Sequence, residues 1–167
     1  MGARTRATAI AVLSALAACG GGGGGGSEGG GAPASLDPRL VGTFEASRWF
    51  YDYPDGERIA REDFDATTWI LRLRADGTYD LHREWWVEGD LTNKNEDGTW
   101  SVAPPREADA DGVLQMQNHV GIPCTETFEF AVPDDPDVAL TYWRRDGPTC
   151  DGTREYSFYR VEWARIE

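Results

Sequence analysis

Apolar and polar residues alternate in short runs over most of the chain from residue 36 onward. A period of two is typical of β-strands that bury one face, and the Gly, Pro and Asp between the runs favour turns. The pattern predicts an all-β, antiparallel structure of about eight short strands, arranged as a sandwich or a barrel. The strands are expected over residues 40–49, 69–73, 79–87, 98–102, 113–120, 125–132, 138–142 and 154–163. Only residues 52–66 lack the alternation, and within them we expect a short helix over 57–64.

The alternation also predicts the register of the hairpin around Ala75-Asp76-Gly77. A two-residue Asp-Gly turn would place Leu73 opposite Asp80 and mix apolar with polar faces. A three-residue loop instead pairs Leu73 with Tyr79, and it is usually built from a type I turn followed by a left-handed glycine. Because the apolar face fixes the register, we expect the three-residue loop. It directs Trp85 inward and the adjacent Trp86 outward.

Four segments resemble the turns and aromatic strands of the lipocalin-like domains of bacterial lipoproteins, a group of calycin-type barrels. They are Leu40-Val41-Gly42-Thr43-Phe44, Leu73-Arg74-Ala75-Asp76-Gly77-Thr78-Tyr79, Asp97-Gly98-Thr99-Trp100-Ser101-Val102 and Tyr156-Ser157-Phe158-Tyr159-Arg160-Val161. The resemblance covers nearly all of residues 36–167. It implies an antiparallel up-and-down barrel whose interior is either plugged by side chains or holds a small apolar ligand.

The first 18 residues have the pattern of an export signal. A basic start with Arg4 and Arg6 precedes an apolar run that is too short to span a bilayer, since a spanning helix needs about 20 residues. Leu16-Ala17-Ala18-Cys19 resembles a lipobox, which implies cleavage before Cys19 and a lipid on its thiol. The alternative is a plain secretory signal in which Cys19 has no special role. Gly20 in place of Asp favours, by analogy with enteric sorting, the outer membrane, facing the periplasm or the cell surface.

Composition separates a tether from a folded domain. Residues 19–35 are Gly-rich after Cys19 and offer almost no side chains to bury, so we expect a flexible spacer followed by one domain over residues 36–167. The chain has 16 Lys and Arg against 29 Asp and Glu, a formal net charge of −13. This excess of acid argues against nucleic-acid binding and against electrostatic docking on anionic lipid. We therefore expect the protein to attach to the membrane through its N-terminal lipid alone.

Two cysteines remain if Cys19 carries the lipid, namely Cys124 and Cys150. An even pair in an oxidising compartment predicts a disulfide. The bridge would close a loop of about 27 residues, for which the chain-entropy model gives about 3–4 kcal/mol. A redox pair would have Cys-x-x-Cys spacing, so a structural bridge is favoured.

Aromatic residues supply the candidate ligand site. The chain has 7 Trp, 6 Tyr and 6 Phe, which either line a cavity or fill the barrel, and filling is favoured. Arg83 falls on the apolar face and either anchors a carboxylate ligand or stacks on Trp69 near a barrel end, where it reaches water. Stacking is favoured. The candidates for ligand binding are Trp69, Arg83, Trp85 and Trp100, and the outward Trp86 is a candidate surface contact.

No metal, cofactor or catalytic constellation is predicted. The acidic residues 107–112 have the pattern of half a calcium loop, but Asn118 stands where the bidentate Glu is needed. His82 and His119 lack ligand spacing, and no Gly-x-Ser-x-Gly motif is present. The sequence therefore favours a non-enzymatic, lipid-anchored envelope protein that binds a small apolar or amphipathic molecule. The alternative is a structural or protein-interaction lipoprotein with a solid core, whose protein partner is unknown.

Overall fold

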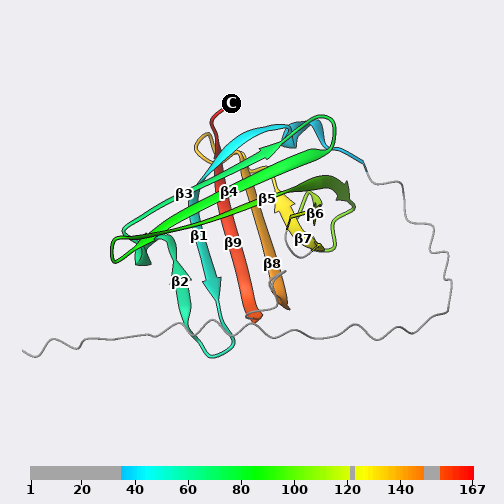
Figure 1. Ribbon diagram of the computed structural model, residues 1–167. Coiled ribbons are helices and arrows are strands. Elements are labelled where there is room, and N and C mark those ends of the chain that lie inside the picture. The colour runs from blue at the N-terminus through cyan, green and yellow to red at the C-terminus, as the bar shows by residue number, and fades with distance from the viewer. Residues whose placement is uncertain (1–34, 121–122, 149–154) are drawn as a thin grey trace, which may run out of the picture. The chain divides into compact units, whose positions relative to one another are not determined.

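The computed structural model describes residues 35–120, 123–148 and 155–167. Eight antiparallel strands form a closed barrel, because β1 pairs with both β3 and β9, and a ninth strand, β2, pairs with β1 (Figure 1). The elements are η1 (Pro38–Leu40), β1 (Gly42–Asp52), β2 (Arg58–Ala60), η2 (Arg61–Asp63), β3 (Ala66–Leu73), β4 (Thr78–Val87), β5 (Asp90–Ala103), β6 (Gly112–Asn118), β7 (Cys124–Ala131), β8 (Leu140–Pro148) and β9 (Glu155–Arg165). The predicted all-β, antiparallel barrel of about eight strands is confirmed.

The β3–β4 hairpin has the predicted register. Leu73 pairs with Tyr79 and Leu71 with Leu81, so the apolar side chains of both strands share one face. Gly77 has a φ of 81°, in the left-handed region that the three-residue loop requires. The prediction of a three-residue loop at this turn is confirmed.

A β-bulge in β1 changes which side chains enter the barrel. The register between β1 and β9 shifts between Ala46 and Arg48. Phe44 and Ala46 are buried before the shift, and Trp49 is buried after it. An extra residue in one strand moves the following side chains to the other face, so Trp49 and Tyr51 come to the interior. The alternation alone did not predict this feature.

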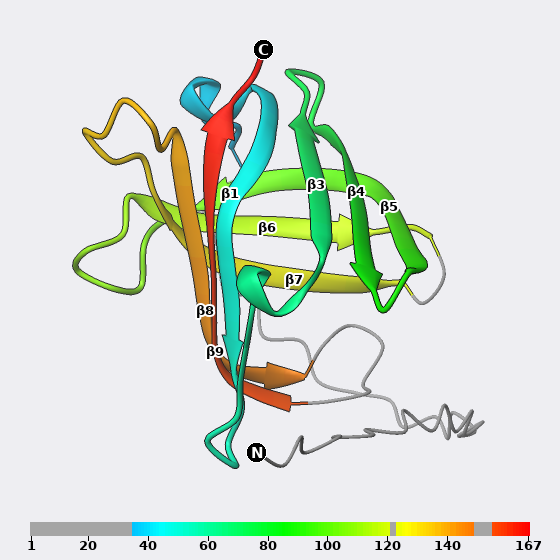
Figure 2. The same cartoon turned by 90° about the vertical axis from the view of Figure 1, so that its left-hand side faces the viewer.

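The two ends of the barrel differ in filling. At the end that holds the start of β1 and the C-terminus of the chain, large apolar side chains pack together, and Leu40 from η1 is fully buried among them. Figure 2 shows β6 and β7 running crosswise to β1 and β9. The fully buried apolar residues at this end include Leu40, Phe44, Leu71, Leu73, Leu114 and Trp163.

The expected helix over residues 57–64 is wrong. The segment forms the short strand β2 and one 3-10 turn, η2, in which the Asp63 carboxylate accepts a hydrogen bond from the Ala60 amide at 2.7 Å. Pairing of Tyr51 with Ile59 extends the sheet beside β1 and competes with helix formation. Neither of the helices in the described part of the chain is long and apolar enough to cross a membrane.

Candidate functional site

A cavity of about 320 Å³ occupies the barrel end opposite the filled one. Strands β1, β3, β4, β5, β6, β7, β8 and β9 all contribute to its wall, and Ile59 and Phe64 from the segment around β2 and η2 lie beside it. Its aromatic lining includes Trp49, Tyr51, Trp69, Trp85, Phe128 and Tyr159. The interior is therefore only partly filled by the aromatic residues, although the sequence favoured complete filling.

Flat aromatic faces form two stacked pairs on this wall. Trp49 and Trp69 stack with ring centroids 4.4 Å apart and planes inclined by 6°. Tyr51 and Tyr159 stack at 4.3 Å with an inclination of 14°. Such pairs add free energy beyond the area they bury. Two pairs of stacked rings therefore form part of the wall.

Arg83 is the main cation of the cavity. Its guanidinium lies over the Trp69 ring, 5.6 Å from the centroid, as the stacking hypothesis predicts. The further expectation that it reaches water is wrong, because its side chain is only 14% exposed. A hydrogen-bonded ion pair with Glu96, which is 7% exposed, replaces the water.

One carboxylate oxygen of Glu96 contacts two cations. Glu96 Oε1 accepts from Arg83 Nη2 and also lies 3.2 Å from Lys94 Nζ. Lys94 is 40% exposed and stands at the rim, whereas Arg83 lies deeper. Because ion pairs strengthen as solvent is excluded, the Arg83–Glu96 contact is the stronger of the two.

A second carboxyl, Glu126, lies on the wall of the cavity. Burial raises the pKa of the Glu126 carboxyl, and the nearby charge of Glu96 raises it further. Burial also raises the pKa of the phenols, which therefore stay protonated and able to donate. These phenols are Tyr51, Tyr142 and Tyr159. The wall thus combines several donors with an acid whose pKa is raised.

Replacing Glu126 is expected to stabilise the barrel at neutral pH. Because folding raises the pKa of Glu126, the folded state favours the protonated carboxyl. The free energy of unfolding therefore falls as the pH rises through the folded-state pKa. Glu126→Gln should therefore raise the Tm at about pH 7, and the gain should shrink as the pH falls toward the ordinary Glu value of about 4.3. Thermal unfolding followed by circular dichroism at several pH values measures both effects.

The exposed Glu45→Gln variant is the matched control, since it removes the same charge from the outer face of β1. Equal gains for the two variants would show that relief of the overall negative charge, and not burial at position 126, is responsible.

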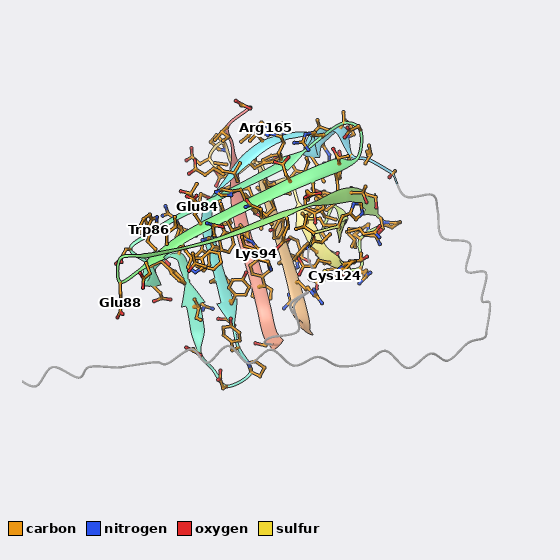
Figure 3. The ribbon with its side chains drawn as sticks, viewed as in Figure 1. Glu84, Trp86, Glu88, Lys94, Cys124 and Arg165 are labelled. Atoms are coloured by element: carbon orange, nitrogen blue, oxygen red, sulfur yellow. The ribbon has the colours of Figure 1, made fainter. Side chains whose placement is uncertain are left out.

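The structure brings together three of the four predicted ligand candidates. Trp69, Arg83 and Trp85 line the cavity. Trp100 is buried away from it and donates its indole N–H to the Arg74 carbonyl at 2.9 Å. Trp86 is 39% exposed and lies on β4, where Figure 3 shows it between Glu84 and Glu88.

The sequence did not lead us to Lys94, Glu96 and Glu126, although the alternation places their side chains on the interior face of the strands. Lys94 and Glu96 share the even-numbered face of β5 with Trp100. Glu126 shares the face of β7 with Phe128. Strand parity extended by four residues before the expected strand 98–102 would have placed Lys94 and Glu96 inside the barrel, and parity within the expected strand 125–132 would have placed Glu126 there.

The other predicted features lie outside the cavity. Among the residues that the structure describes, no group of three His, Cys, Asp or Glu could hold a metal ion. Glu107 from the acidic segment accepts hydrogen bonds from Trp143 Nε1 at 3.1 Å and Arg145 Nε at 3.0 Å. Cys124 begins β7, but Cys150 and Cys19 fall outside the described residues, so the disulfide and the lipidation stay predictions.

The chain matches no family model and none of the curated proteins. Fold and site together define the class: a closed, antiparallel eight-stranded β-barrel with one additional strand and an aromatic cavity at one end, an architecture compatible with a calycin-type fold.

Proposed function

We propose that this protein binds a small apolar or amphipathic molecule inside the barrel and catalyses no reaction on it. The observation that supports the proposal is the aromatic cavity of about 320 Å³. Ligand sites are commonly concave, mostly apolar and equipped with a few polar groups. Arg83, Lys94 and Glu126 are those groups here. A barrel that served only as a solid scaffold would need no such space.

We propose further that a lipid at the N-terminus anchors the protein in the cell envelope. The lipobox-like Leu16-Ala17-Ala18-Cys19 supports lipid attachment at Cys19, and the Gly-rich residues 20–35 supply a spacer. In this arrangement the lipid would hold the protein at the membrane, and the barrel would present its cavity to the aqueous compartment beside it.

Native mass spectrometry of the protein purified from its own host tests ligand binding. We expect a mass above that of the processed chain which disappears when the protein is denatured. Met116, which is buried and lines the cavity, provides the control variant. Met116→Phe should reduce the space and the bound fraction while preserving the barrel. A native mass equal to the denatured mass in every preparation would count against the proposal.

An interaction surface is the second candidate. Trp86 and Leu91 pair across β4 and β5 and are 39% and 44% exposed. Large apolar side chains exposed together can mark a contact with another protein. A crosslinking experiment in the host should then capture a partner that the Trp86→Ser/Leu91→Ser variant loses; capture unaffected by the two substitutions would dismiss this surface.

A further inference from the structure

The buried donors around the cavity lack acceptors. Within the described residues, three cavity-lining side chains each have a buried N–H without a hydrogen-bond partner: Nε1 of Trp49, Nε1 of Trp69 and Nε of Arg83. No buried side-chain oxygen in the described ranges is left unpartnered. A buried donor without a partner costs free energy that an incoming acceptor can recover.

The charges on the wall favour a ligand of negative charge. Arg83 and Lys94 share a single oxygen of Glu96, so two cations are served by one carboxylate. The second acid, Glu126, lies on the same wall, and burial raises the pKa of its carboxyl, which disfavours its charged form. Arg83 and Lys94 are the cationic donors on this wall, and a ligand carboxylate would accept charge-assisted hydrogen bonds from them.

The shape of the cavity limits the apolar part of the ligand. A volume of about 320 Å³ is near the lower end of ligand pockets, which span about 300–1,000 Å³. The stacked pairs Trp49–Trp69 and Tyr51–Tyr159 present flat faces to it. Flat aromatic walls pack well against a flat ring system. A fused or substituted ring therefore fits this space better than a long alkyl chain.

We propose that the ligand is a compact aromatic carboxylate, with its ring between the aromatic walls and its carboxylate directed toward Arg83 and Lys94. This inference rests on the proposed binding function and makes it specific. It assigns Arg83 to the deep end of the carboxylate site and Lys94 to its rim.

Three naphthalene probes that differ only in their polar group test the ligand class by isothermal titration calorimetry on the full chain. The probes are 2-naphthoate, 2-naphthalenemethanol and (2-naphthylmethyl)trimethylammonium. We expect the acid to bind at least about tenfold more tightly than the alcohol, as expected for hydrogen bonds to charged groups, and the ammonium to bind most weakly. Equal affinities for acid and alcohol, or a preference for the ammonium, would overturn the ligand class and leave the binding function standing. Binding of none of the three would also overturn the class, and native mass spectrometry would then decide the function separately.

A pair of charge variants tests the assigned contact. Lys94→Gln should weaken the binding of 2-naphthoate several-fold and leave the affinity for the alcohol unchanged, because only the acid contacts the ammonium group of Lys94. Arg48→Gln removes the same charge from the outer face, where the Arg48 side chain is 72% exposed. Equal weakening by both variants would show a long-range charge effect and would overturn the contact with Lys94.

Discussion

Glu96→Ala is expected to destabilise the barrel by about 3–5 kcal/mol, the usual cost of removing one partner of a buried ion pair. The substitution leaves the Arg83 guanidinium beneath the aromatic wall without its carboxylate, and Arg83 is only 14% exposed. Lys94 loses its partner as well, but it stands at the rim, where water solvates its ammonium group. Urea unfolding monitored by tryptophan fluorescence measures the free energy of unfolding.

Two comparisons separate the ion pair from the loss of a side chain. Replacing both partners, as in Arg83→Met/Glu96→Leu, should recover most of the loss, because apolar replacements of a buried pair are often neutral or stabilising. Asp52→Ala removes the carboxylate of the Arg58–Asp52 pair, in which Arg58 is 59% exposed, and should cost less than about 1 kcal/mol. A double variant as unstable as Glu96→Ala would contradict this account.

The alternation predicted the antiparallel strands, because one face of each strand is mostly apolar and the turns are local, and the resemblance to lipocalin-like domains favoured a barrel over a sandwich. At the β3–β4 hairpin, Leu73 and Tyr79 pair across a loop that ends in Gly77, so periodicity and turn chemistry were enough to give the register. The bulge in β1 was not predictable in the same way. Whether Trp49 and Tyr51 point inward depends on a register shift against β9, which is more than 100 residues away along the chain.

The site was predicted only in part. Trp69 and Trp85 follow from alternation, and Arg83 was recognised because a cation stood on an apolar face. Lys94, Glu96 and Glu126 were not recognised, because charged residues near strand ends are usually solvated. Their burial results from barrel closure, which brings β5 and β7 around one cavity. The size of the cavity is also a property of closure, since it depends on how completely side chains from eight strands fill the interior.

Trp69→Ala is expected to cost about 3–5 kcal/mol in unfolding free energy and to admit a larger aromatic acid. The indole is 4% exposed and stacks on Trp49, and its N–H has no hydrogen-bond partner among the described residues, so the loss is one of packing and of the contact with the Arg83 guanidinium. The removed ring belongs to the cavity wall, and its space joins the cavity. We therefore expect the variant to bind 1-pyrenecarboxylate more tightly than the native protein does, because its cavity is larger than the native cavity of about 320 Å³.

Trp163→Ala is the matched control for this enlargement. Trp163 is also an indole that is fully buried and has an unpartnered N–H among the described residues, but it lies outside the cavity wall. It should lose stability in the same range of about 3–5 kcal/mol without gaining affinity for the pyrene acid. Titration calorimetry and urea unfolding on both variants measure the two quantities independently. A residue of the cavity wall must change which ligands fit, whereas a core residue changes stability alone. If Trp69→Ala gains no affinity for the pyrene acid, or if both variants gain it equally, then Trp69 does not limit the size of the ligand.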